Sequence, residues 1–260
     1  MGEFKGKVVV VTGGSRGIGR GIAVAFAREG AQTVLASSSE QNLTAAAKAV
    51  AAQGAPPVTV AGDLRTLAAC EQLFRRVNES FGRCDILVNN AGATRAGNFL
   101  DLPDEVWLDG FALKFFGAVR LTRLFWPLLK SAQGHLVNII GGAARTVEPE
   151  FLVGGSVNAA AANFTKGLSR LGMRDGVQVN AIHPGQTATE RTERLIEQRA
   201  AAAGKTVEEI RKAMVEKSGT RRMATPEDIA ELTLFLCSER ARQIQGTAIA
   251  VDGGTTPGVY

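Results

Sequence analysis

The stretch Val8-Val9-Val10-Val11-Thr12-Gly13-Gly14-Ser15-Arg16-Gly17-Ile18-Gly19 decides the fold of this chain. Four consecutive valines fit a strand that is buried on both faces of a parallel sheet. Gly13, Gly17 and Gly19 stand between that strand and a helical segment, where they let the backbone turn tightly, approach a pyrophosphate and pack the helix on the strand. The N-terminus of that helix offers free N–H groups and a positive dipole end to phosphate. The stretch therefore predicts a dinucleotide-binding turn.

Short β-rich runs alternate with longer helical segments along the whole chain, which indicates a parallel sheet covered by helices. The predicted strands are Lys7–Thr12, Gln32–Ala36, Pro57–Ala61, Asp85–Asn89, His135–Ile140, Gln178–Ile182 and Thr247–Val251. The predicted helices are Ile18–Arg28, Gln41–Ala52, Leu67–Ser80, Asp104–Lys130 and Ser156–Leu171, and a further helix that Thr225 caps. We expect a single α/β domain over residues 1–260, a Rossmann-type doubly wound parallel sheet of about seven strands with helices on both faces.

Composition narrows the class of protein. The 260 residues are 45% hydrophobic and only 6% aromatic, which suits one aliphatic core. No leader pattern is present and no apolar run approaches the roughly 20 residues of a membrane-spanning helix, so we expect a soluble, cytoplasmic protein without a membrane partner. The formal charge of +5 is interleaved with acids, which favours a solvated basic surface over a nucleic-acid site. Cys70, Cys84 and Cys237 lack the spacing of disulfides or zinc sites, so we expect buried thiols and no metal.

Residues 186–219 break the alternation of strands and helices. They are charged and alanine-rich and contain two short helical patterns. An insertion after a strand end in a nucleotide-binding fold is the expected place of a substrate lid. Basic residues outnumber acidic ones between Arg191 and Arg222, which favours a small anionic substrate such as a carboxylate or an acyl thioester.

Four further motifs follow the glycine turn in order: Asp63-Leu64, Asn89-Asn90-Ala91-Gly92, Pro184-Gly185 with Thr189, and Asp252-Gly253-Gly254. Together with that turn they make the chain resemble the short-chain dehydrogenase/reductase family over essentially its whole length. The resemblance implies an oxidoreductase that assembles as a homotetramer. It also implies that Asp63 and Leu64 bracket the adenine and that Asn90, Ala91 and Gly92 line the adenosine ribose. By the same resemblance the nicotinamide is framed by Pro184, Gly185, Thr187 and Thr189.

The end of the second predicted strand indicates which cofactor is used. An NAD-specific site needs a carboxylate there, which accepts from the ribose 2′-hydroxyl and repels a 2′-phosphate. The sequence reads Ala36-Ser37-Ser38-Ser39, with no acid before Glu40. Arg16 can reach a phosphate, and the serine hydroxyls can donate to it. We therefore predict NADP, with NAD as the alternative, held at its phosphate end by Gly13, Ser15, Arg16, Gly17, Ile18, Gly19, Ser37 and Ser38.

The catalytic residues depart from the family pattern. The family's usual chemistry uses a mid-chain tyrosine as acid or base, a lysine one helical turn later, an upstream serine and an asparagine on the preceding long helix. The only tyrosine in this chain is Tyr260. Judged by neighbouring residues, the resemblance places the tyrosine position at Gly154 and the lysine position at Asn158. It places the serine position at Gly141 and the asparagine position at Lys114, so that all four are substituted.

Asparagine and lysine thus exchange places between two of these positions. We predict that Lys114 and Asn158 are catalytic, that Lys114 is an unusual proton donor, and that water fills the space left by Gly141 and Gly154. In the alternative, Lys114 extends to solvent and Asn158 is a satisfied polar residue on a packed helix. Other titratable groups near the predicted cleft are His183, which we expect to be structural, and Arg145, Glu148 and Glu150.

Three functions remain open on this basis. The first is an NAD(P)-dependent oxidoreductase that acts on a carbonyl or enoyl substrate with a non-standard proton donor. The second is a catalytically silent nucleotide-binding subunit that forms a hetero-oligomer with an active homologue. The third is a lyase or isomerase that uses the same pocket. Lys114 favours the first and third functions, and the glycines at 141 and 154 favour the second because they leave a void.

Overall fold

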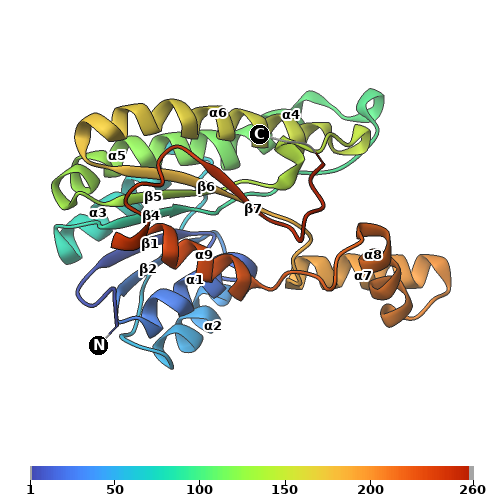
Figure 1. The fold of residues 1–260 in the computed structure, drawn as a ribbon, viewed down its shortest axis with the longest axis horizontal. Helices are drawn as coiled ribbons and strands as arrows, with labels where there is room; N and C mark the ends of the chain where they lie inside the picture. The colour runs from blue at the N-terminus through green and yellow to red at the C-terminus, as the bar shows by residue number, and fades with distance from the viewer. Residues whose placement is uncertain (1, 258–260) are drawn as a thin grey trace.

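The computed structural model describes residues 2–257 and contains a seven-stranded sheet (Figure 1). Its strands lie in the order β3-β2-β1-β4-β5-β6-β7, and all neighbouring strands are parallel. They are β1 (Val8–Thr12), β2 (Gln32–Ser37), β3 (Val58–Ala61), β4 (Ile86–Asn89), β5 (His135–Ile139), β6 (Gln178–Pro184) and β7 (Ala248–Val251). The strand order reverses between β1 and β4, where the carboxyl ends of strands leave a crevice for ligands. The predicted fold class is confirmed.

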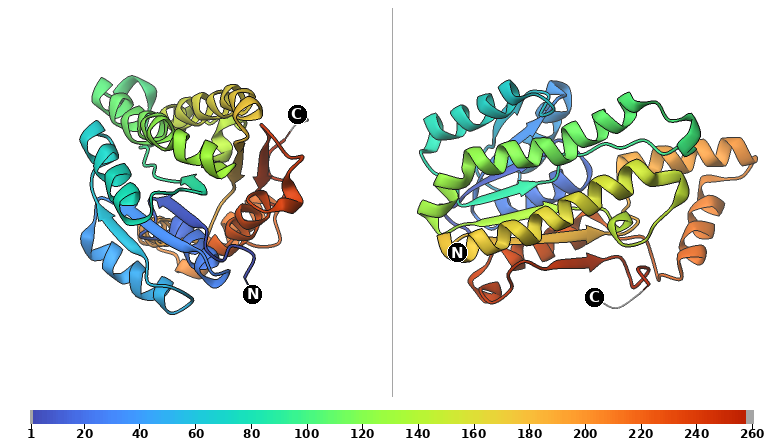
Figure 2. Two further views of the ribbon diagram at one scale, coloured as in Figure 1. Left: turned by 90° about the vertical axis from the view of Figure 1, so that its left-hand side faces the viewer. Right: turned by 90° about the horizontal axis from the view of Figure 1, so that it is seen from above.

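Helices cover both faces of the sheet (Figure 2). One face carries α1 (Gly17–Arg28), α2 (Glu40–Ala51) and α9 (Pro226–Leu236), and the other carries α3 (Leu67–Phe81), α4 (Asp104–Phe111), α5 (Gly117–Ala132) and α6 (Leu152–Asp175). Two helices, α7 (Glu190–Ala203) and α8 (Val207–Ser218), project beyond the carboxyl ends of the strands (Figure 1). Within residues 2–257, no helix is long and apolar enough to cross a membrane.

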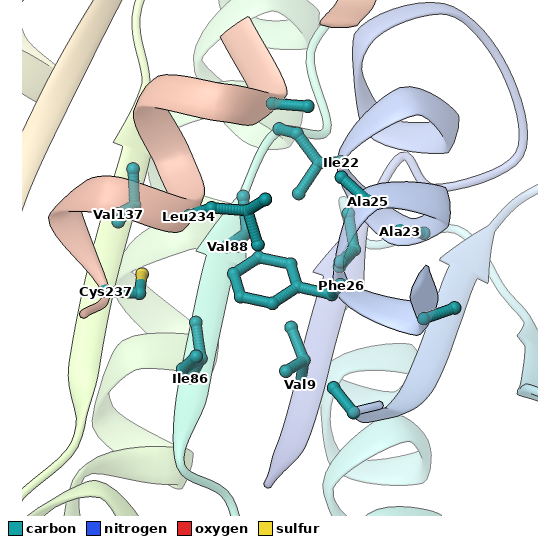
Figure 3. Packing of buried hydrophobic residues seen from close by; sticks show 14 of the residues in the cluster. Val9, Ile22, Ala23, Ala25, Phe26, Ile86, Val88, Val137, Leu234 and Cys237 are labelled. Carbon is teal, nitrogen blue, oxygen red and sulfur yellow. The ribbon is translucent and has the colours of Figure 1, made fainter. Parts of the chain in front are cut away.

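The core is aliphatic on both sides of the sheet. Between α1, α9 and the sheet, the Phe26 ring packs among side chains that include Val9, Ile86 and Leu234 (Figure 3). Because side chains of a strand point alternately to its two faces, Val10 belongs instead to the cluster beneath α3 and α5. The run of valines is therefore buried on both faces, as predicted. The three cysteines are buried free thiols, which was also expected.

The predicted helix over Asp104–Lys130 is wrong in one respect, because it is not continuous. A π-helical segment, Ala112–Phe116, separates α4 from α5 and contains Lys114. Such wider turns are rare and often occur at functional sites.

The predicted helix over Ser156–Leu171 was too short, since α6 begins at Leu152. Gly154 and Gly155 have low helix propensity. The packing of Val153 in a buried cluster with Val106 of α4 outweighs that low propensity, so the helix includes both glycines.

A buried hydrogen-bond chain fixes α5 and α6 against the sheet. Asn89 Nδ2 donates to Asn138 Oδ1 at 2.9 Å, and Asn138 Nδ2 donates to Thr165 Oγ1 of α6 at 2.8 Å. Asn89 Nδ2 also lies 3.2 Å from Thr122 Oγ1 of α5. Leaving one such buried group without its partner costs about 1–3 kcal/mol. These hydrogen bonds therefore hold the helices that border the crevice in one position.

Candidate functional site

A cleft of about 840 Å³ opens at the carboxyl ends of the strands. It is bounded by the glycine turn, the ends of β2, β4 and β6, the π segment and the start of α7. Nearly all of the predicted cofactor residues line it: Gly13, Ser15, Arg16, Gly17, Ile18, Ser37, Ser38, Asp63, Leu64, Asn90, Ala91, Gly92, Pro184, Gly185, Thr187 and Thr189. The structure thus brings together residues that the sequence separates by up to 176 positions, from Gly13 to Thr189.

The three glycines of the turn have different roles. Gly13 and Gly17 have φ angles of +63° and +51°, in the left-handed region that side chains disfavour. Gly19 does not line the cleft. A Cβ atom there would overlap the Gly13 carbonyl oxygen and approach Asn90 Nδ2 to 2.5 Å. Gly19 therefore lets α1 pack closely on β1, while Gly13 and Gly17 shape the surface that faces the cleft.

Asn90 braces the glycine turn from the neighbouring strand. Its Nδ2 donates to the carbonyl oxygens of Thr12 and Gly13 at 3.0 and 3.2 Å. Thr12 Oγ1 accepts in turn from the N–H groups of Asn90 and Ala91, both at 3.0 Å. The amide of Asn90 is thus committed to holding β1 and β4 together at the switch point.

The end of β2 presents hydroxyl groups to the cleft and no carboxylate. Ser15 Oγ donates to Ser37 Oγ at 2.8 Å, and Ser38 lies beside them in the cleft wall. Asp63, two residues after β3, accepts from Arg65 Nη1 at 3.0 Å and is therefore already paired. The helix N-terminus, the close-packed glycines and these hydroxyls fit a dinucleotide that carries an additional phosphate.

Lys114 of the π segment lines the cleft. A Cβ atom at Gly92 would lie 2.9 Å from Lys114 Cδ, so the lysine stem rests on the bare backbone of that glycine. Burial, and to a smaller extent the positive charge of Arg191, lower the pKa of the Lys114 ammonium to about 8. A lysine with such a pKa can give up or take a proton close to neutral pH.

The space predicted beside Gly154 does not exist, so that part of the prediction was wrong, and at Gly141 the place of a side chain is taken although its backbone lines the cleft. A Cβ atom at Gly141 would lie 2.8 Å from Asn158 Nδ2, and one at Gly154 would overlap the ring of Phe151. The side chains of Asn158 and Phe151 occupy these two places, as expected because protein interiors contain few voids. Asn158 is only 3% exposed, and its Oδ1 accepts from the Gly141 N–H at 3.0 Å. The structure therefore places Asn158 behind Gly141, outside the lining of the cleft.

The other titratable candidates do not line the cleft either. His183 is fully buried with its Nδ1 3.2 Å from the Gly141 carbonyl oxygen, and burial lowers its pKa. Arg145 Nη2 donates to the Ala248 carbonyl oxygen at 3.0 Å, and Glu148 and Glu150 are exposed. Among the described residues, no three His, Cys, Asp or Glu side chains gather as metal ligands.

The sequence predicted a lid over residues 186–219 but did not indicate which side chains of α7 line the cleft. Arg191, Leu195 and Arg199 follow one another at four-residue spacing and line the cleft together, and Met214 of α8 joins them. Arg191 Nη2 donates to the carbonyl oxygen of Thr94 at 3.0 Å, which ties α7 to the loop after β4. The helical spacing of these residues was the signal available in the sequence.

Comparison with known proteins identifies the family. The family model described as Enoyl-(Acyl carrier protein) reductase matches residues 13–256. An uncharacterized oxidoreductase of Mycobacterium tuberculosis is 35% identical over 98% of this chain and 94% of its own length. The chain belongs to the short-chain dehydrogenase/reductase family. Membership places it among NAD(P)-dependent oxidoreductases.

Two further members of the family have named substrates. The D-beta-hydroxybutyrate dehydrogenase of Cupriavidus necator is 32% identical to this chain, over 96% of this chain and 98% of its own length. The L-sorbose reductase of Gluconobacter frateurii, solved in complex with NADPH and L-sorbose, is 32% identical. Its structure matches this one with a TM-score of 0.95 and covers 100% of this chain and 99% of that one.

Proposed function

We propose that this protein is an NADP(H)-dependent oxidoreductase that interconverts a carbonyl and a hydroxyl group on a small anionic substrate, with Lys114 as the proton donor and acceptor. The observation that carries the proposal is the placement of Lys114 in the cleft, on the bare backbone of Gly92, with its pKa lowered to about 8.

The cofactor would be held by the glycine turn and the end of β2. The N–H groups at the start of α1 would bind its pyrophosphate, and the hydroxyls of Ser37 and Ser38 with the Arg16 guanidinium would bind a 2′-phosphate. When bound, the nicotinamide supplies or accepts the hydride. Support for NADP(H) over NAD(H) comes from the missing carboxylate at the end of β2 and from a relative solved with NADPH.

Lys114 would serve as a general acid when a carbonyl is reduced. Its ammonium would stabilise the negative charge that develops on the carbonyl oxygen and then deliver a proton from Nζ to that oxygen. In the opposite direction the neutral amine would remove the hydroxyl proton. A pKa of about 8 leaves both forms populated in the neutral to mildly alkaline range, which both directions need.

The anionic substrate is supported by the charges on the lid side of the cleft. Arg191 and Arg199 of α7 line it together with Lys114. Arginine is suited to carboxylates because its planar group can form two parallel hydrogen bonds. A relative named for a hydroxy acid, D-beta-hydroxybutyrate, agrees with this substrate class. We therefore expect small hydroxy or keto acids to be better substrates than neutral ketones.

The test is the variant Lys114→Met, which keeps the stem of the side chain and removes its proton. NADP(H) affinity should be unchanged, while turnover on a verified substrate should fall by about 10²–10⁴. Lys114→Arg should also lose turnover, because arginine keeps the charge but cannot be deprotonated in proteins. The matched control is Lys48→Met on the exposed side of α2. Full activity of Lys114→Met would contradict the proposal.

A second function is favoured by the ring of Phe151, which closes the space beside Gly154. In this alternative the protein is a silent nucleotide-binding subunit that partners an active homologue. Nicotinamide turnover measured against keto acids, ketones, enones and acyl thioesters distinguishes the two. Tight binding of NADP(H) without turnover on any of these substrates would favour the silent subunit.

A further inference from the structure

Glu190, the first residue of α7, contacts the glycine turn across 173 positions of sequence. Its Oε2 accepts a hydrogen bond from the Gly17 N–H at 3.0 Å, and its Oε1 forms an ion pair with Arg20 Nη2 at 2.7 Å. Thr189 also packs against Gly17, since a Cβ atom added to that glycine would lie 3.2 Å from Thr189 Cγ2. The first turn of α7, which belongs to the predicted lid, therefore lies against the start of α1.

The Gly17 N–H belongs to a phosphate-binding element. It is the first N–H of α1, and the first N–H groups of a helix have no partner within the helix. In a dinucleotide-binding fold, these groups and the positive end of the helix dipole bind the pyrophosphate. The Glu190 carboxylate satisfies this N–H as a phosphate oxygen would, because both are anionic acceptors.

The carboxylate of Glu190 is ionised at neutral pH. Burial alone would raise its pKa, but hydrogen bonds from its own N–H and from Gly17, together with the charge of Arg20, outweigh burial and lower it. Two anions that share one N–H group repel each other strongly in a partly buried place. Glu190 and a pyrophosphate therefore exclude each other at Gly17.

We propose that Glu190 is an internal anion that competes with the pyrophosphate of the cofactor for the start of α1, so that cofactor binding releases the first turn of α7 from the glycine turn. This inference rests on the proposed binding of NADP(H) but not on the chemistry of Lys114. It makes Glu190 a residue that sets cofactor affinity and couples the cofactor site to the lid.

The test is calorimetry on Glu190→Gln, which keeps the shape of the side chain and removes its charge. NADP(H) should bind roughly tenfold more tightly, since a neutral acceptor forms the weaker hydrogen bond with Gly17. Adenosine 2′-monophosphate, which lacks the pyrophosphate, should bind both proteins equally. The control is Glu193→Gln, one turn further along α7, because Glu193 pairs with Arg211 at 2.6 Å instead of the glycine turn. This control should leave both affinities unchanged.

A second readout is independent of ligand. Hydrogen exchange over residues 189–203 should be faster in Glu190→Gln than in the unchanged protein, because the tie to α1 is weaker. If Glu190→Gln binds NADP(H) with unchanged or weaker affinity, the proposed role of Glu190 is refuted, while the proposed function of the protein is not. An equal gain for adenosine 2′-monophosphate would do the same. If neither protein binds NADP(H) or NAD(H), the proposed function fails together with this inference.

Discussion

Replacing Lys114 with methionine should stabilise the fold at neutral pH while it removes activity. The pKa of Lys114 falls from 10.5 to about 8 because the folded protein disfavours its charge. At ~1.36 kcal/mol per pKa unit, the difference sets an upper bound of ~3 kcal/mol on the stability that this ammonium removes. Methionine buries the same stem without a charge, so Lys114→Met should gain a large part of that amount.

The gain should depend on pH in a defined direction. Below the folded-state pKa of about 8, both the folded and the unfolded chain carry the proton, and the full penalty applies. Between that value and 10.5, the unfolded chain binds more protons than the folded one, so stability rises with pH. Above 10.5 the penalty is gone. The unchanged protein should therefore approach the stability of Lys114→Met as the pH rises through this window.

The assay is urea unfolding followed by circular dichroism at about pH 7 and again near pH 10, two conditions on either side of most of the titration. Lys48→Met serves as the exposed control and should change stability by less than about 0.5 kcal/mol. A Lys114→Met protein that is less stable at neutral pH would refute the reasoning. If Lys114→Met gains the same free energy of unfolding at both pH values, the gain comes from packing and not from removal of the buried charge.

Four other outcomes are expected. Calorimetry should show NADP(H) binding about one to two decades more tightly than NAD(H), and Ser37→Asp should reverse this preference; equal affinities in the unchanged protein would contradict the assignment. Gly92→Ala should lower turnover but not cofactor binding, because its Cβ would come 2.9 Å from Lys114 Cδ; an unaltered rate would show that the stem position is unimportant. Residues 186–219 should exchange amide hydrogens faster than the central strands and slow when substrate binds. Light scattering should give a homotetramer that buries apolar side chains exposed on the outer helices, such as Met173 of α6 at 75% exposure, and a monomer at micromolar concentration would contradict this.

Most of the fold could be predicted because its signals are local. The buried valines at 8–11 and the turn residues that follow each strand fix the strand positions to within one or two residues. The largest strand error is at β6, which continues to Pro184 because His183 and Pro184 still pair with Ala250 and Val251 of β7. A proline normally ends such a run, and only the partner strand shows that pairing goes on.

The candidate site was predicted less completely because its details depend on contacts between distant residues. Nothing near Gly17 in the sequence indicates that Glu190 accepts its N–H. Likewise, the glycine at 154 predicts an opening, and only the course of the chain before α6 shows that Phe151 fills it. The π segment that carries Lys114 also has no sequence signal that distinguishes it from a regular helix.

The apparent exchange of lysine and asparagine has a physical explanation in these contacts. The Gly141 N–H needs an acceptor, and Asn158 Oδ1 supplies one, whereas a lysine has no acceptor atom. A serine at 141 would collide with Asn158 Nδ2, so the glycine and the asparagine depend on each other. A single change back toward the family pattern would therefore break an existing contact without restoring the usual chemistry.

The other titratable groups that line the cleft support the proposed role of Lys114 as proton donor. Among the described residues that line the cleft, two are carboxylates. Asp63 pairs with Arg65 after β3, and Glu190 pairs with Arg20 beside the glycine turn. Lys114 is partly desolvated, unpaired with any acid in the described structure and lowered in pKa to about 8. In the proposed reaction, we therefore expect the proton to be exchanged with the substrate at this amine, which carboxylates paired with arginines elsewhere in the cleft would not replace.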